Sequence, residues 1–267
     1  MPWQIVDARI RSDPARPLLT AYSDPPGDPD GADRIDLTGA SWANWVAKTA
    51  NLLVDGLALD VGADPVPVVA VDLPPHWQVA VWADAVSRVG ARLVGSGSLA
   101  PLRSSGLLAS EPPAVAVTTG GAAAVALSAG AGEVVVAPLL PMNAPSPEAL
   151  PSGALDYATE VGQYGDRFVP APREPRADDE ALLSASATLV QTAALAPGAR
   201  LLSAGTLPGS PWVELLAVAS VGGSLVLSPD ADGLTAPDRD ARWNTEKVTA
   251  VVPADAHLWS PAGRPGS

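Results

Sequence analysis

Cysteine is absent from the 267 residues, and lysine is nearly absent, with Lys48 and Lys247 the only two. Without cysteine there can be no disulfide, thiolate nucleophile or zinc–thiolate site, and a reducing cytoplasm is the compartment that we expect. No apolar run approaches the roughly 20 residues that cross a bilayer, and the charged opening MPWQIVDARIRSDPARP has no signal-peptide pattern. The sequence therefore predicts a soluble cytoplasmic protein.

Positive charge is also scarce, because 16 basic residues stand against 29 acidic ones and give a formal net charge of −13. A surface of this sign repels phosphate backbones and anionic membranes. We therefore expect neither a nucleic acid nor a membrane as partner. A small molecule, a protein partner or a second copy of the chain remain open, and a hydrophobic content of 47% is ample for a core.

Residues 41–57, SWANWVAKTANLLVDGL, have apolar side chains at spacings of three and four. This spacing predicts an amphipathic helix, and Ser41 is its expected N-cap.

Residues 66–94 predict a strand, a helix and a second strand with a parallel, right-handed connection. The apolar run VPVVAVD at 66–72 is typical of a buried strand. Pro75 suits the first turn of the helix, Trp82 lies in its buried stripe, and Gly90 suits the position after its end.

His76 and Trp77 admit two interpretations. His76 can act as a general base because imidazole titrates near neutral pH. No acid or nucleophile accompanies it in the sequence, and a place at the start of a helix explains it without chemistry. We favour packing, with Trp77 and Trp82 covering the sheet and His76 at its rim.

The alternation of apolar runs and helical patterns continues along the chain. Further strands are expected at 113–117, 133–139, 200–205, 224–228 and 248–252, and helices at 155–164, 181–195 and 212–221. Segments 167–180 and 228–240 are expected to be loops. Such alternation predicts an α/β protein with mainly parallel sheets flanked by helices.

Two parts of the sequence resemble adenylate-forming enzymes, the superfamily of acyl-CoA synthetases and AMP-dependent ligases. These parts are residues 41–94, from SWANWVAKTANLL to GARLV, and residues 200–228, RLLSAGTLPGSPWVELLAVASVGGSLVLS, followed by the closing EKVTAVV. The closest similarity is to a small actinobacterial family distantly similar to AMP-binding enzymes. The resemblance implies a fold like part of the N-terminal domain of these enzymes.

The motifs that carry the chemistry of that superfamily are missing. Adenylation requires a Ser/Thr/Gly-rich loop with a lysine, so that N–H groups and a cation surround the ATP phosphates. Its expected place, residues 169–180, reads VPAPREPRADDE, and Leu207-Pro208 stands where the family has an aromatic–histidine pair. No Tyr-Gly-x-Thr-Glu stretch is present, and we expect the C-terminal domain with the catalytic lysine to be missing as well.

Two strand ends are candidate binding sites. Ser203, Thr206, Gly209 and Ser210 follow an expected parallel strand at its carboxyl end, where ligands bind in open α/β sheets. No G-x-S-x-G elbow accompanies them.

The second candidate is the anion nest that Thr118, Thr119 and Gly120 can form at a helix start, for which a plain turn is the favoured alternative. The acidic run 178–180 lacks the spacing of a calcium loop, and we interpret it as a solvated first turn of a helix. No catalytic residue and no metal site is assigned.

The leading hypothesis is a non-catalytic, acyl-CoA synthetase-like protein that binds a small ligand or a protein partner and uses no cofactor. One alternative is a ligase-class enzyme with a weak residual site for ATP, AMP or CoA. Another is a structural homo-oligomer, which an exposed cluster among the eight tryptophans would favour. We expect residues 1–267 to form one α/β domain, with possible lobes at 65–185 and at 1–64 with 186–255, and a flexible tail at 256–267.

Overall fold

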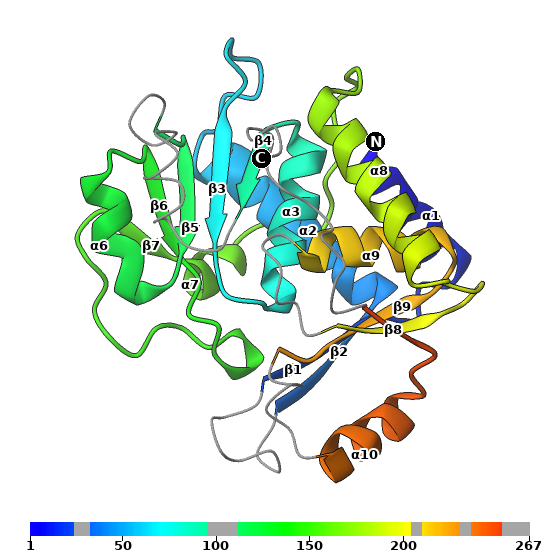
Figure 1. Ribbon diagram of the computed structural model, residues 1–267. Coiled ribbons are helices and arrows are strands. Elements are labelled where there is room, and N and C mark those ends of the chain that lie inside the picture. The colour runs from blue at the N-terminus through cyan, green and yellow to red at the C-terminus, as the bar shows by residue number, and fades with distance from the viewer. Residues whose placement is uncertain (24–32, 96–111, 204–209, 230–235, 253–267) are drawn as a thin grey trace, which may run out of the picture.

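The computed structural model describes residues 1–23, 33–95, 112–203, 210–229 and 236–252 (Figure 1). Two five-stranded sheets form the frame, in the orders β10-β8-β9-β1-β2 and β4-β3-β5-β6-β7. The strands are β1 (Pro17–Ser23), β2 (Asp33–Thr38), β3 (Val68–Asp72), β4 (Arg92–Gly95), β5 (Val115–Thr118), β6 (Glu133–Val136), β7 (Ala154–Asp156), β8 (Arg200–Ser203), β9 (Ser224–Leu227) and β10 (Ala250–Val251).

The helices connect and cover these strands. They are α1 (Pro2–Ser12), α2 (Gly39–Asn51), α3 (Trp77–Val89), α6 (Gly120–Ser128), α7 (Tyr157–Val161), α8 (Ala177–Thr192), α9 (Ser210–Ser220) and α10 (Ala236–Glu246). A π-helical turn, Leu52–Gly56, extends α2, and a 3-10 turn, Pro141–Asn143, follows β6. Every paired strand is parallel to its neighbour except β1 and β2, which are antiparallel. The predicted α/β class with mainly parallel sheets is confirmed.

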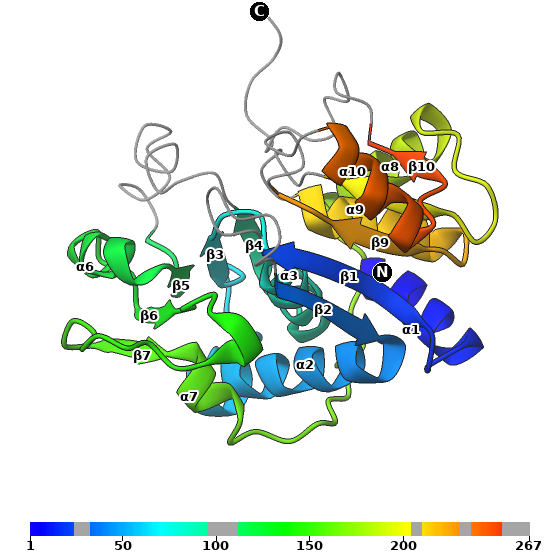
Figure 2. The same ribbon diagram turned by 90° about the horizontal axis from the view of Figure 1, so that it is seen from below.

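Alternate residues of the inner strands face different layers, as the period of two in a strand requires. In β8, Leu201 belongs to the main core beside the central helices, whereas Leu202 packs on the opposite face with Val248. In β5, Val117 faces the main core, and Ala116 packs against α6. Helices α2, α3 and α9 therefore lie between the two sheets, while α6 covers the outer face of one sheet and α10 that of the other (Figures 1 and 2).

The predicted unit at residues 66–94 is confirmed as β3, α3 and β4, with β3 and β4 paired in parallel from Val68 opposite Arg92. Gly90 ends α3 in the left-handed conformation, with φ +86°. The helix starts later than predicted, because the backbone of His76 is extended (φ −157°) and serves as the N-cap, so that Pro75 precedes the first turn. Nδ1 of His76 accepts a hydrogen bond from the backbone N–H of Gln78 at 3.3 Å.

Three expectations about local structure are wrong. Thr38, not Ser41, caps α2, because the chain leaves β2 at Thr38 and its Oγ1 accepts the N–H of Ser41 at 3.1 Å. The helix expected at 155–164 is short, since Leu155 and Asp156 complete β7 and α7 ends at Val161. Helices α8 and α10 begin inside the segments 167–180 and 228–240, which were both expected to be loops.

A buried carboxylate joins three helices. Asp84 on α3 is fully buried and accepts Nε1 of Trp42 at 2.9 Å and Nε of Arg88 at 2.9 Å. Arg88 also donates to Asp7 of α1 at 2.6 Å. The charge of Asp84 is therefore paired and hydrogen-bonded, which is the condition for a carboxylate to remain in a core.

The tryptophans of the described residues are mostly internal. Trp42, Trp82 and Trp212 are among the largest fully buried side chains, and Trp77 is 4% exposed. Trp243 is 37% exposed, and in the described ranges the tryptophans form no exposed cluster of the kind that would favour a structural homo-oligomer. The lobe limits remain predictions, and the expected tail at 256–267 lies outside the described residues. Among the described helices, none combines the length and apolar character that crossing a bilayer requires.

Candidate functional site

Ser203, the candidate at the end of β8, uses its hydroxyl inside the protein. It is 2% exposed, and its Oγ donates to Oε1 of Glu214 on α9 at 2.7 Å. Thr206 and Gly209 lie outside the described residues, and Ser210 is the first residue of α9. Ser203 thus fastens β8 to α9, and a ligand at this strand end remains a prediction.

Thr118, Thr119 and Gly120 lie where β5 passes into α6. Thr118 is fully buried, and its Oγ1 has no hydrogen-bond partner among the described atoms. Thr119 is the N-cap of α6 without a side-chain cap bond. Asp72 stands opposite Thr118 on β3. An anion nest at this strand end remains a prediction.

Two arginines, Arg173 and Arg176, bind the segment at 167–180 to the rest of the fold. This segment stands in the expected place of the phosphate loop. The two terminal nitrogens of Arg173 donate hydrogen bonds to the two carboxylate oxygens of Asp179, at 2.6 and 2.9 Å. Arg176 donates to the carbonyl oxygens of Gly90 at 2.7 Å and Ala91 at 2.9 Å. We call residues 173–179 the arginine strap, because they tie the start of α8 to the end of α3.

The strap lies at the amino-terminal edge of its sheet. Gly90 and Ala91 immediately precede β4, which runs parallel to β3, so that both strands start at this edge. The start of α8 is seen beside the end of α3 in Figure 1. Ligands of open α/β sheets bind beyond the opposite, carboxyl-terminal edge, so the strap is on the wrong side to hold one there.

The acidic run at 178–180 is not a solvated turn throughout, which corrects the expectation for Asp179. This side chain is 4% exposed, and it caps α8 by accepting the N–H of Arg176 at 2.9 Å. Burial opposes its ionisation, but hydrogen bonds from Arg173 and from the backbone of Arg176 outweigh burial and lower its pKa. In the described ranges, no group of three or more His, Asp or Glu side chains is placed to hold a metal ion.

A cleft opens where strands of both sheets reach their carboxyl ends. Its volume is about 130 Å³, and its walls follow the ends of β1, β3 and β6. We call it the inter-sheet cleft and define it by six of its lining residues: Tyr22, Arg34, His76, Trp77, Leu139 and Asn143. This is the position at which the fold predicts a ligand.

The polar groups of the cleft have defined states. Burial lowers the pKa of His76 to about 4, so the ring is neutral near pH 7. Because its Nδ1 accepts the N–H of Gln78, we assign the ring proton to Nε2. Asn143 is held by Gln78, whose Nε2 donates to its Oδ1 at 2.8 Å.

Sequence analysis considered His76 and Trp77 but missed the other four residues. Leu139 ends an expected strand and Asn143 follows it, so the rule that ligands gather at carboxyl ends of parallel strands was the available signal. Tyr22 and Arg34 carried no signal, because their strands β1 and β2 were not predicted.

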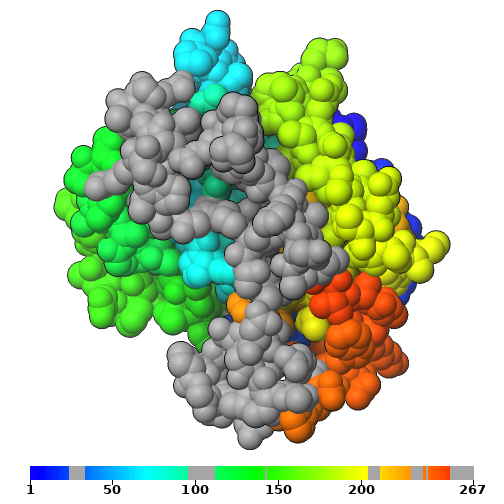
Figure 3. Space-filling model, in the orientation of Figure 1, coloured from blue at the N-terminus to red at the C-terminus, as the bar shows by residue number. Residues whose placement is uncertain are grey.

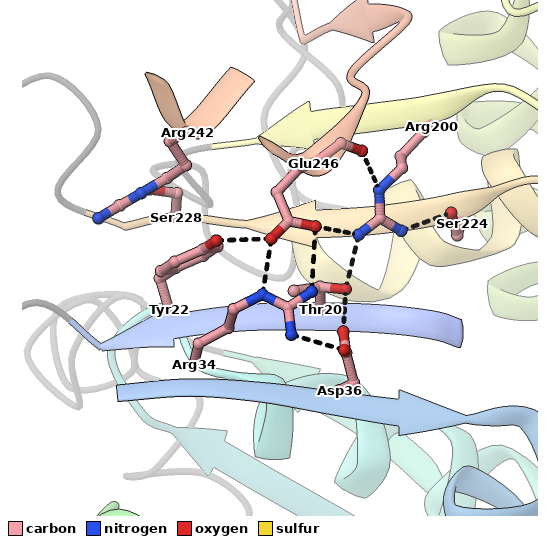
Figure 4. A network of polar contacts seen from close by, with 9 residues as sticks. All are labelled: Thr20, Tyr22, Arg34, Asp36, Arg200, Ser224, Ser228, Arg242 and Glu246. Atoms are coloured by element: carbon pink, nitrogen blue, oxygen red, sulfur yellow. Dashed lines mark hydrogen bonds and ion pairs between the residues drawn. The ribbon is translucent and has the colours of Figure 1, made fainter. Parts of the chain in front are cut away.

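On the outer face of the sheet that contains β1 and β2, a polar network fixes the position of Arg34 (Figure 4). Glu246, at the end of α10, has a side chain that is 2% exposed, and it accepts Nε of Arg34 at 2.7 Å and the hydroxyl of Tyr22 at 2.5 Å. Arg200 pairs with the other oxygen of Glu246, and Asp36 pairs with Arg34 at 2.6 Å. The network holds α10 on the outer face of its sheet.

This network predicts a pH dependence. Burial opposes ionisation of Glu246, but hydrogen bonds from Arg34, Tyr22 and Arg200 outweigh it and lower the pKa to about 2. A carboxyl group with a depressed pKa stabilises the fold above its unfolded pKa, near 4.5, and loses this contribution as the pH falls toward 2. From about pH 6 to about pH 2, we expect the wild type to lose about 2 kcal/mol more unfolding free energy than Glu246→Gln, after allowance for screening at the exposed edge.

Urea titrations across this pH range measure the difference. The exposed Glu148 provides the matched control, because Glu148→Gln removes the same charge outside the network and should retain the wild-type pH profile. Parallel profiles for the wild type and Glu246→Gln would contradict the assigned role of the carboxylate.

A second pocket, of about 290 Å³, also includes Asn143 among its lining residues. Lys48 lines it, but its Nζ donates to the carbonyl oxygen of Tyr164 at 2.8 Å. Trp45 also lines it and meets Trp77 edge to face, with ring centroids 5.2 Å apart. Figure 3 shows the surface on which the two halves of the chain meet. The cyan-to-green segments form its left side, and the yellow-to-orange segments from α8 to α10 form its right side.

Comparison with known proteins places this architecture. No family model matches the sequence. A Mycobacterium tuberculosis protein described as a TIGR03089 family protein is 36% identical over 254 residues, which cover 93% of this chain and 96% of that protein.

Solved structures of CoA ligases share the fold at low sequence identity. The acyl-CoA synthetase of Brucella canis matches with a TM-score of 0.70 and 18% identity, over 94% of this chain and 46% of its own. The acetoacetyl-CoA synthetase of Streptomyces lividans matches with a TM-score of 0.62 and 20% sequence identity. The match covers 91% of this chain and 40% of that protein. An anthranilate CoA ligase matches with a TM-score of 0.64 and 16% sequence identity. The match covers 85% of this chain and 44% of that protein.

The chain therefore spans less than half the length of these structures, and identities of this size show the fold alone. The resemblance to adenylate-forming enzymes is confirmed at the level of fold. The chain belongs to the TIGR03089 family and has the α/β fold of part of the N-terminal domain of an acyl-CoA synthetase.

Proposed function

We propose that this protein is a non-catalytic member of the acyl-CoA synthetase-like fold that acts by binding a small ligand or a protein partner. The observation that carries the proposal is the arginine strap. In the expected place of a phosphate loop, the two arginines of the strap both bind protein groups. Arg173 binds Asp179, and Arg176 binds backbone carbonyl oxygens at the end of α3.

The chemistry of adenylation supports this proposal. A carboxylate and a triphosphate are both anions, so their reaction requires a dense array of N–H donors and cations. In the segment 169–180, Pro170, Pro172 and Pro175 have no N–H, and the acids at 178–180 repel phosphate. Loss of one well-placed donor costs about 100-fold to 1,000-fold in rate, and here several are replaced together.

We therefore expect no carboxylate-dependent exchange of pyrophosphate into ATP above the buffer control. The assay uses the full chain with short, medium and aromatic carboxylates, beside Lys48→Ala and Lys247→Ala variants. Exchange that disappears with either lysine would overturn the non-catalytic proposal. Exchange that survives both substitutions and fades on repeated purification belongs to a trace host ligase and leaves the proposal standing.

The role of the strap has its own control. We expect the double variant Arg173→Ala, Arg176→Ala to lower the midpoint of thermal unfolding without changing the response to ATP, because both arginines bind protein groups. A loss of ATP-induced stabilisation in this variant would instead indicate a nucleotide site and favour the ligase-class alternative.

A thermal-shift panel of ATP, AMP, CoA and acyl-CoA, read beside the oligomeric mass, separates the remaining alternatives. A ligand that binds only the folded state raises the midpoint by mass action. A rise with nucleotide or acyl-CoA would favour the residual site. If no ligand raises the midpoint and the protein is a monomer, a protein partner is favoured. If no ligand raises it and the protein is a stable dimer, the structural homo-oligomer is favoured.

A further inference from the structure

We infer that the Pro-rich segment 169–176 is a docking surface for a partner protein that recognises proline in an aromatic-lined groove. The inference rests on the proposed binding function and names its partner class. The segment reads VPAPREPR and has the spacing Pro-x-x-Pro at Pro172 and Pro175. We call it the proline ridge. It lies between α7 and α8 and overlaps the arginine strap (Figure 1).

The first argument is the backbone that this composition imposes. Proline fixes φ at about −65°, and the residue before a proline is driven into the extended region. One of these two rules applies to every residue of the ridge except Arg173 and Arg176. Arg176 is also extended, with φ −112° and ψ 167°. Among the described contacts, residues 169–175 take part in no backbone–backbone hydrogen bond, as is typical of a polyproline II helix.

The second argument is a period of three in the exposure of the side chains, which is the period of a polyproline II helix. Positions 170, 173 and 176 are half-buried, and both arginines among them bind protein groups. Positions 169, 172 and 175, with the side chains Val169, Pro172 and Pro175, are all exposed. These three apolar side chains therefore follow one edge of the ridge that faces solvent.

The exposed edge contains an apolar side chain that the fold does not bury. Val169 is 88% exposed, whereas the other exposed large apolar side chains in the described ranges are 37–40% exposed. A spacer that only joins two helices needs no apolar edge. Exposed apolar side chains that lie together are instead typical of a surface that a partner covers.

Contacts at both ends hold the ridge in place before any partner arrives. On the side of α7, the amide nitrogen of Asn51 donates to the carbonyl oxygens of Gly165 at 2.8 Å and Arg167 at 3.0 Å. Phe168 then packs against the main core. At the other end, Arg176 binds the backbone at the end of α3. A polyproline II segment that is already formed loses little entropy on binding, which favours recognition.

The charge of the ridge selects among proline-recognising partners. Glu174 is exposed on the ridge, and Asp178 and Glu180 follow in the first turn of α8. Arg173 and Arg176 are bound to protein groups, so the ridge presents acids and no available arginine to a partner. A groove with an acidic rim is therefore disfavoured. We expect aromatic side chains in the groove and lysine or arginine at its rim.

A panel of purified proline-recognising domains tests the inference on the full chain. The panel consists of SH3, WW and EVH1 domains with acidic or basic groove rims, and calorimetry measures binding. We expect at least one domain with a basic rim to bind with a Kd of about 100 μM or tighter. A polyproline peptide that occupies the same groove should displace the protein. If no domain of the panel binds, the inference is overturned.

The double variant Pro172→Ala, Pro175→Ala is the decisive one. Both prolines are exposed, so the unfolding midpoint should stay near that of the wild type. The affinity for the domain should fall by about tenfold or more. The control, Pro145→Ala, Pro147→Ala, makes the same change at two exposed prolines outside the ridge and should bind as the wild type does. Equal affinities of the two double variants would contradict the inference.

A charge reversal tests the expected rim of the groove. Glu174→Lys should weaken binding to a domain with a basic rim by about threefold or more, because like charges then meet. Glu148→Lys reverses an exposed acid outside the ridge and should leave the affinity unchanged. If both variants bind as the wild type does, the assigned charge of the partner is wrong.

The oligomeric mass provides a further check. A dimer that dissociates in the Pro172→Ala, Pro175→Ala variant would make the ridge a contact between copies of this chain and would overturn the partner class. None of these binding results affects the pyrophosphate-exchange test, so the ridge can fail while the non-catalytic proposal stands. Exchange activity with intact domain binding would overturn the non-catalytic proposal alone.

Discussion

Replacement of Trp82 by alanine is expected to lower the free energy of unfolding by about 3–5 kcal/mol. The indole lies on the buried face of α3, is fully inaccessible to solvent and packs against Tyr157 with ring centroids 4.9 Å apart. Its removal leaves a cavity between α3 and α7 that rigid neighbours fill only in part, so both the transfer and the cavity contribution are lost.

Two variants calibrate this loss in urea titrations. Trp243→Ala makes the same change at a side chain that is 37% exposed and should cost only about 0.5 kcal/mol. His76→Ala removes the N-cap of α3, for which we expect about 1 kcal/mol. A ranking in which His76→Ala or Trp243→Ala exceeds Trp82→Ala would refute the assignment of Trp82 to the core.

Removal of Asp84 is expected to be of similar size, about 3–5 kcal/mol for Asp84→Ala. Its carboxylate is fully buried, and it neutralises Arg88, whose side chain is only 10% exposed. Without it, the guanidinium retains Asp7 alone, and Nε1 of Trp42 loses its acceptor. An unpaired buried charge destabilises the fold by more than the intact pair stabilises it. The expected loss of unfolding free energy therefore comes mainly from Arg88, which is left with too few partners.

The comparison with Asp7 makes this prediction specific. Asp7→Ala removes the other partner of Arg88, at a side chain that is 25% exposed, and should cost about 1 kcal/mol or less. The double variant Asp84→Leu, Arg88→Met removes both charges and should recover most of the stability. Equal losses for Asp7→Ala and Asp84→Ala would show that burial does not set the cost.

The sequence predicted those elements whose patterns are dictated by burial on both sides. Strands such as β3, β5 and β9 are continuous apolar runs because helices cover both faces of their sheets, and α3 shows its stripe and its Gly90 stop. Strands β1 and β2 escaped prediction because their outer face carries Tyr22, Arg34 and Asp36 in the network under α10. Polar residues on a strand resemble a loop until their partner is known.

The candidate site was predicted only in its general position. Carboxyl ends of parallel strands were the expected location, but the two strand ends chosen were those of β5 and β8. The inter-sheet cleft depends on the approach of β1, β3 and β6 from two sheets, which no local pattern encodes. Asn143 in particular gains its place from Gln78, which lies 65 positions earlier in the chain.

The order of the strands has a consequence for how the chain folds during synthesis. One sheet is built entirely from residues between Val68 and Asp156, so it can assemble as soon as this stretch has left the ribosome. In the other sheet, β1 pairs with β9 through Leu19 and Leu225, and a two-stranded hairpin is marginally stable by itself. The β1–β2 hairpin must therefore wait, with its inner apolar face unpaired, until β9 has been made, about 200 residues later in the chain. This delay is a contact-order barrier that slows folding and exposes the nascent chain to aggregation.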